Sequence, residues 1–138
     1  MNGDRDLLIR ARAALLDALE ALAEHCDSVV VIGAQAIYLR AGAISVPLPE
    51  MTKDSDLALD PRSLRSEPLI EEAMRRAGFA PRVDKPQPGT WLNREGIPVD
   101  LMVPQALSGE GGRRGARLPP HSNSAMRRAS GLEAAVVD

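Results

Sequence analysis

A short run of β-branched residues, Ser28–Ile32, limits the fold of this chain more than any other stretch. It reads Ser-Val-Val-Val-Ile, and a continuous apolar run of this kind is typical of a strand that is buried on both faces. Gly33 follows directly, and Ala34–Arg40 is expected to form a helix. Such a strand–glycine–helix junction would present free backbone N–H groups and the positive end of a helix dipole, where a phosphate could bind.

Two further helices are expected from the spacing of apolar residues and from capping residues. Leucines and alanines that recur at three-, four- and seven-residue intervals predict an amphipathic helix over Asp4–Glu24. A second helix is predicted over Ser66–Ala77, with Ser66 as its N-cap, Pro68 in its first turn and Gly78 directly after its end.

The remaining strands complete the expected architecture. They cover Ser55–Leu59, Phe79–Val83, Trp91–Asn93 and Ile97–Val103, and the last two form a hairpin around Arg94-Glu95-Gly96. Asp100 alternates with apolar neighbours in its strand, so it should face away from the valines. The order of elements predicts an α/β (α+β) fold, a small mixed β-sheet flanked by helices, in a single domain spanning residues 1–138.

Composition narrows the classes of function. The chain has 138 residues and a net charge of −2, so no overall basic field favours nucleic acid. It contains one Phe, one Tyr and one Trp, which nearly excludes a base-stacking platform and predicts an aliphatic core. The single Cys26 and the charged N-terminus favour a cytoplasmic location. The chain ends on an apolar run, Ala134–Val137, and we therefore expect that a C-terminal region is missing.

A pair of aspartates at the start of a strand is the first candidate for chemistry. Side chains alternate along a strand, so Asp54 and Asp56 should point the same way, roughly 6.6 Å apart. That spacing suits a divalent metal ion, and the mutual repulsion of two carboxylates makes a cation or an arginine an expected neighbour. Asp60 has the same parity but lies roughly 13 Å further along, so it is interpreted as a cap before Pro61.

The order of these motifs resembles a known family. An apolar strand followed by Gly-Ala, then Thr-x-Asp-x-Asp, then a further Asp on a later strand, resembles the nucleotidyltransferase fold shared by DNA polymerase β and the minimal nucleotidyltransferases. The AbiEii-like enzymes of bacterial toxin–antitoxin systems are the most similar in character. The resemblance covers residues 28–104 and includes these positions: Gly33, Ala34, Thr52, Lys53, Asp54, Asp56 and Asp100.

The resemblance implies a reaction and a site. Asp54, Asp56 and Asp100 would be the catalytic carboxylates and would bind Mg²⁺ together with the phosphates of an NTP, and Asp100 would also deprotonate the attacking hydroxyl. The nucleotide-binding positions would be Gly33, Ala34, Thr52 and Lys53. The implied activity transfers a nucleoside monophosphate from an NTP to a hydroxyl of an RNA such as tRNA, or of a protein.

Other interpretations stay open at the level of the sequence. Ala34 stands where the family has Gly or Ser, and Glu50 lies where many relatives carry an arginine, which favours a catalytically inactive binding module or remnant of the same fold. An RNA-binding accessory domain that uses Arg113–Arg117 and Arg127-Arg128 is a third hypothesis. His121 is expected on the surface of a loop.

Overall fold

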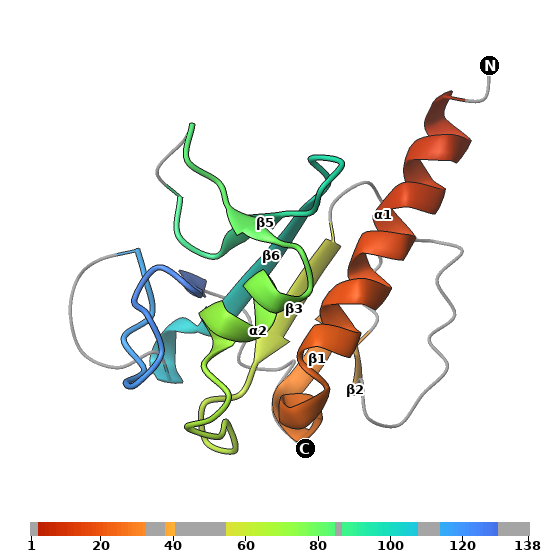
Figure 1. Ribbon diagram of the computed structural model, residues 1–138. Coiled ribbons are helices and arrows are strands. Elements are labelled where there is room, and N and C mark those ends of the chain that lie inside the picture. The colour runs from red at the N-terminus through yellow and green to blue at the C-terminus, as the bar shows by residue number, and fades with distance from the viewer. Residues whose placement is uncertain (1–2, 33–37, 41–54, 85–86, 108–113, 130–138) are drawn as a thin grey trace.

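The computed structural model describes residues 3–32, 38–40, 55–84, 87–107 and 114–129, which form one β-sheet with helices packed on it (Figure 1). The helical elements are α1 (Gly3–Ala21), α2 (Ile70–Arg76) and two short 3-10 turns at Ala23–Ser28 and Gln105–Leu107. The strands are β1 (Val29–Ile32), β2 (Tyr38–Arg40), β3 (Ser55–Leu59), β4 (Ala80–Pro81), β5 (Thr90–Leu92), β6 (Pro98–Pro104) and β7 (Arg127–Ala129).

The sheet is mixed, and β6 is its best-connected strand. The strand order is β2-β1-β3-β6-β5-β4, with β7 also paired to β6. The β3–β6 and β6–β7 pairs are parallel, and the others are antiparallel. One edge of β6 is taken by β3, while the other is shared by β5 near the start of β6 and β7 near its end. The predicted fold class, a small mixed sheet with helices, is confirmed.

The main core lies between the helices and one face of the sheet. In Figure 1 both α1 and α2 lie in front of the strands, and buried side chains of both helices belong to one cluster with alternate residues of β1, β3 and β6. The sheet residues in this cluster are Val29, Val31, Leu57, Leu59, Val99, Leu101 and Val103. Because side chains alternate along a strand, the residues between these positions point to the opposite face. There, Val30, Ala58 and Leu107 form a second, smaller apolar cluster.

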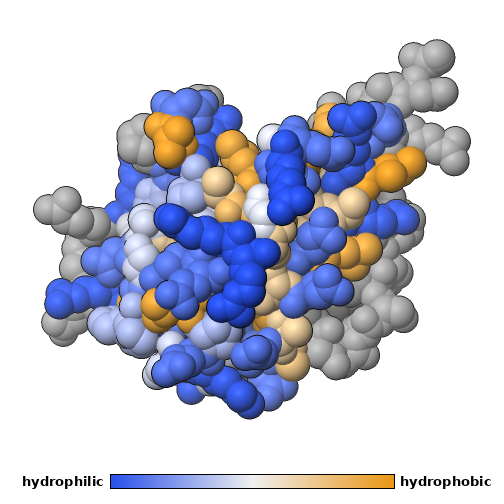
Figure 2. Space-filling model, viewed as in Figure 1, coloured by the Kyte–Doolittle hydropathy of each residue, from blue (hydrophilic) through white to orange (hydrophobic). Residues whose placement is uncertain are grey.

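The outer surface of the helical face is polar. Figure 2 shows it as largely hydrophilic, with small and separate apolar patches. Within the described residues, no helix combines the length and the apolar character that a bilayer-spanning segment needs.

The second predicted helix begins later than expected. Ser66 is not its N-cap, and Pro68 is not in its first turn, because α2 starts at Ile70 with Leu69 as the N-cap. A residue before proline is disfavoured in the α conformation, so the segment around Pro68 stays outside the helix. Gly78 follows the helix with φ of +95°, as its predicted role requires. Of the expected strand Phe79–Val83, only Ala80–Pro81 pairs with a neighbour.

The helix predicted for Ala34–Arg40 is wrong in its last three residues. Tyr38–Arg40 forms β2, which pairs antiparallel with β1 so that Tyr38 lies opposite Ile32 and Arg40 opposite Val30. This pairing gives hydrogen-bond partners to the outer edge of β1, and tyrosine favours strands. A seven-residue segment is also too short for its apolar spacing to distinguish a helix from a strand. Residues 33–37 lie outside the described part of the chain.

His121 is buried, with 5% of its surface exposed, and its predicted position on the loop surface is wrong. The backbone N–H of Ile70 donates to His121 Nδ1 over 3.1 Å, and His121 Nε2 donates to the carbonyl of Arg65 over 2.8 Å. Its ring lies edge-on to that of His25, with centroids 5.8 Å apart. Through these two hydrogen bonds His121 ties the start of α2 to the loop that carries Arg65.

Burial of His25 makes the fold sensitive to mild acid. Burial lowers the pKa of His25 below 6.5, with a further lowering by His121 and Arg65, against the raising effects of the Pro68 carbonyl and Glu24. The unfolded chain therefore binds the proton more readily than the folded one. We expect the free energy of unfolding to be at its full value above pH 6.5 and to fall progressively below it.

Urea unfolding at pH 7.5, 6.5 and 5.5 checks this expectation. The matched variant is His25→Gln, because the glutamine amide can still donate to the Pro68 carbonyl but does not titrate. The variant should lose less stability than the wild type between pH 7.5 and 5.5. Equal losses in the two proteins would show that His25 does not cause the acid sensitivity.

Candidate functional site

A row of polar residues crosses the face of the sheet that α1 and α2 do not cover. Asp56 on β3 lies directly opposite Asp100 on β6, and Asp100 lies directly opposite Thr90 on β5. Residues paired in this way point to the same face, and neighbouring strands lie about 4.8 Å apart. The register therefore places two carboxylates and a hydroxyl side by side, although Asp56 and Asp100 are distant in the sequence.

The packing of β6 and the turn before it determine where Asp100 points. Val99 and Leu101 are fully buried in the helical core, so Asp100 between them must face the other way, as predicted from the alternation. The β5–β6 hairpin sets the register. In its turn, Asn93 Oδ1 accepts the N–H groups of Glu95 and Ile97 over 2.9 and 2.8 Å. These hydrogen bonds hold the turn in one conformation, which sets the strand register that pairs Thr90 with Asp100.

Thr90 and Arg127 contact Asp100 directly, and neither was predicted as a site residue. Thr90 Oγ1 donates to Asp100 Oδ1 over 2.6 Å, and Arg127 Nη2 lies 3.7 Å from Asp100 Oδ2. Arg127 Nη1 donates to Thr90 Oγ1 over 3.2 Å and to the Pro88 carbonyl over 3.3 Å. A cation or an arginine was expected beside Asp54 and Asp56, and Asp54 lies outside the described residues; Arg127 places a positive charge beside Asp100 instead.

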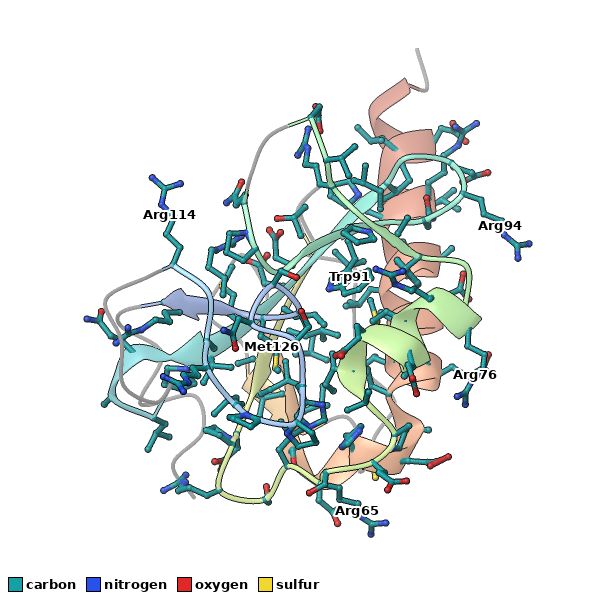
Figure 3. All side chains as sticks on the ribbon, turned by 60° about the vertical axis from the view of Figure 1, so that its left-hand side comes forward. Arg65, Arg76, Trp91, Arg94, Arg114 and Met126 are labelled. Atoms are coloured by element: carbon teal, nitrogen blue, oxygen red, sulfur yellow. The ribbon has the colours of Figure 1, made fainter. Side chains whose placement is uncertain are left out.

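The position of Arg127 follows from the parallel pairing of β7 with β6. Arg127 lies opposite Met102, which is two residues beyond Asp100 and on the same face, so Arg127 and Asp100 are diagonal neighbours. The Arg127 side chain is only 15% exposed. It is therefore not displayed for RNA in the way that the accessory-domain hypothesis requires. Arg114, by contrast, extends away from the molecule (Figure 3).

The chain passes very close to β6 and β7 just before Thr90. Gly89 has φ of +88°, and a Cβ atom at this position would meet the Leu101 carbonyl oxygen at 2.5 Å and the Arg127 nitrogen at 2.8 Å. The Gly89 N–H donates to the Ser124 carbonyl, and its own carbonyl accepts the Leu101 N–H. A glycine at this position lets three segments of backbone meet beside the polar row.

Sequence patterns could have identified Thr90 but not Arg127. Counting back from the hairpin turn pairs Thr90 with Asp100, and a threonine opposite an aspartate is a plausible hydrogen-bond partner. Arg127 reaches the site through a parallel pairing that no local pattern indicates.

Asp60 lies apart from this row, as predicted. It is 5% exposed, and its carboxylate accepts the backbone N–H of Arg62 and two guanidinium hydrogen bonds at 2.9 Å from the same residue. It shapes the turn after β3.

Five of the predicted site residues fall outside the described ranges: Gly33, Ala34, Thr52, Lys53 and Asp54. Among the described residues, no group of three His, Cys, Asp or Glu side chains is placed to hold a metal ion. The register does bring Asp56 and Asp100 together, and two carboxylates supply the oxygen ligands that Mg²⁺ prefers.

Comparison with known proteins gives the family. A nucleotidyltransferase family model matches residues 10–137, which is nearly the whole chain. The match includes both carboxylates of the row, as well as Thr90 and Arg127. No curated protein and no solved structure matches the chain. On the strength of the family match, this protein belongs to the nucleotidyltransferase family.

Proposed function

We propose that this protein transfers a nucleoside monophosphate from an NTP to a hydroxyl group of a macromolecule, with Mg²⁺. The observation that carries the proposal is the side-by-side placement of Asp56 and Asp100 on the face of the sheet opposite α1 and α2, in a chain of the nucleotidyltransferase family. Phosphoryl-type transfer needs positioning and charge neutralisation more than covalent participation by the protein. Two carboxylates at paired positions of neighbouring strands suit that requirement.

The residues present fit a divalent cation. Asp56 and Asp100 are hard oxygen ligands, and their mutual repulsion is relieved when a cation lies between them. Asp54 precedes Asp56 by two residues in the sequence and is proposed as the third ligand. The ion would neutralise charge on the triphosphate and on the departing pyrophosphate.

The roles of the side chains follow from this arrangement. Asp54 and Asp56 would bind Mg²⁺ together with the nucleotide's phosphates. Asp100 would accept the proton of the acceptor hydroxyl while the oxygen of that hydroxyl forms a bond to the α-phosphorus. The bond from the α-phosphorus to the bridging oxygen breaks, and pyrophosphate leaves. Gly33, Ala34, Thr52 and Lys53 are proposed to contact the nucleotide, as the family resemblance implies.

The acceptor is proposed to be tRNA or a partner protein. This proposal rests on the resemblance of the motifs to the AbiEii-like enzymes of toxin–antitoxin systems, and a role in such a system is proposed on the same ground.

Labelled nucleotides test the reaction. The protein is incubated with Mg²⁺, cell extract and each NTP labelled either at the α- or at the γ-phosphate. Nucleotidyl transfer labels a macromolecule only from the α-labelled NTP, because the γ-phosphate leaves in pyrophosphate. Ribonuclease or protease treatment then identifies the acceptor class. Label from the γ-position, or no label at all, would contradict the proposal.

A calorimetric titration separates the active enzyme from the inactive remnant that Ala34 and Glu50 suggest. The enzyme should bind an NTP more tightly when Mg²⁺ is present. Absence of Mg²⁺-dependent binding, together with absence of transfer, would favour the remnant.

A further inference from the structure

We propose that Thr90 and Arg127 are positioning residues that hold the carboxylate of Asp100 in one orientation, ready to bind a divalent cation. The inference rests on the proposed function, since it concerns the same carboxylate. It assigns roles to two residues that lie outside the family motifs quoted above.

The contact between Thr90 and Asp100 is short and shielded from water. Thr90 is 4% exposed, and its hydroxyl donates to Asp100 Oδ1 over 2.6 Å. A hydrogen bond to an ionised acceptor at this distance belongs to the stronger class in proteins. This hydrogen bond restricts rotation of the Asp100 carboxylate about its Cβ–Cγ bond.

Arg127 determines the direction of that hydrogen bond. A guanidinium group can only donate, and a threonine hydroxyl has a single proton. Arg127 Nη1 donates to Thr90 Oγ1 over 3.2 Å, so the hydroxyl accepts from Arg127 and must give its own proton to Asp100. Asp100 Oδ2 lies 3.7 Å from Arg127 Nη2, which adds an ion pair to the same carboxylate.

All three residues are carried by paired strands, which makes the array rigid. Thr90 lies opposite Asp100 in the β5–β6 pair, and Arg127 lies opposite Met102 in the β6–β7 pair. Arg127 is held further by its hydrogen bond to the Pro88 carbonyl. Partners of metal ligands that are held in this way typically raise metal affinity about 10–100-fold.

The test compares Thr90→Val with Thr90→Ser. Valine keeps the branched shape that suits a strand but removes the hydroxyl, whereas serine keeps the hydroxyl. Binding of Mn²⁺ alone, as a probe for Mg²⁺, is measured by electron paramagnetic resonance. Thr90→Val should bind Mn²⁺ about 10–100-fold more weakly than the wild type, and Thr90→Ser within about threefold of it. Urea unfolding of each variant confirms that it is folded at the assay temperature.

Arg127→Met provides an independent test, because the two possible roles of Arg127 predict opposite changes in Mn²⁺ affinity. If Arg127 positions Asp100, Mn²⁺ binding should weaken in this variant. If Arg127 only repels the cation through its charge, removing it should strengthen binding, and that result would overturn its assigned role.

The outcomes separate this inference from the proposed function. If the wild-type protein binds Mn²⁺ and Thr90→Val binds it equally well, the positioning role of Thr90 is overturned while the proposed function stands. If the wild-type protein does not bind Mn²⁺ alone, the inference is overturned, whereas the proposed function is decided separately by the transfer of label from an α-labelled NTP.

Discussion

Replacing Asp56 with asparagine is expected to lower the rate of nucleotidyl transfer at least about 100-fold. The substitution keeps the shape of the side chain but removes the charge that, with Asp100, would bind the cation and neutralise the triphosphate. Such charge stabilisation contributes several kcal/mol to the transition state, and each 1.36 kcal/mol corresponds to about a tenfold change in rate. The measurement is the initial rate of macromolecule labelling from an α-labelled NTP.

Urea unfolding of Asp56→Asn confirms that the variant is folded at the assay temperature, so that a loss of transfer is not a loss of the fold. Asp60→Asn is the matched control, because Asp60 lies at the end of the same strand and binds Arg62 instead. Asp60→Asn should keep its transfer activity. An Asp56→Asn protein with wild-type activity would remove Asp56 from the site.

Gly89→Ala is expected to lower the free energy of unfolding by about 3 kcal/mol or more. The new Cβ would lie 2.5 Å from the Leu101 carbonyl oxygen and 2.8 Å from the Arg127 nitrogen, and neither backbone atom can rotate aside. A positive φ adds about 1–2 kcal/mol for a residue with a side chain, and overpacking adds about 1–3 kcal/mol. Urea unfolding gives the value. This loss is large compared with the roughly 5–15 kcal/mol that stabilises a typical domain.

Gly96→Ala is the control that separates the two causes. Gly96 also has a positive φ, of +80°, but a Cβ atom there would have no neighbour within 4 Å. It should therefore lose only the conformational contribution, about 1–2 kcal/mol. If the two variants lost equal stability, close approach of the backbone at Gly89 would not be the reason for its glycine.

The elements that could be predicted are those with strong local patterns. The apolar run Val29–Ile32, the strand after the paired aspartates and the hairpin around Gly96 each combine β-forming residues with clear turn residues, and all three form as expected. Alternation in β6 also predicted the direction of Asp100. Half of the proposed site therefore follows from local rules and from a motif order that resembles the family.

The elements that could not be predicted depend on contacts between distant segments. β2 forms because the outer edge of β1 needs hydrogen-bond partners. β7 forms because the last part of β6, Met102–Pro104, has an edge that no other strand covers among the described residues. His121 is buried because its ring accepts the N–H of Ile70, a residue 51 positions earlier. Arg127 enters the site for the same reason, since its pairing with β6 has no counterpart in the pattern of residues around it.

The buried tryptophan makes the order in which these contacts form observable. Trp91 is the single tryptophan of the chain, and its indole N–H donates to the Ala125 carbonyl, just before β7. Thr90 and Asp100 are separated by 10 residues, whereas Arg127 and Thr90 are separated by 37. Since the entropy lost on closing a loop grows with its length, the hairpin contact can close first during folding and the arginine can join later. Intrinsic fluorescence of Trp91 therefore reports when β5 becomes buried in the core beside the segment that leads into β7.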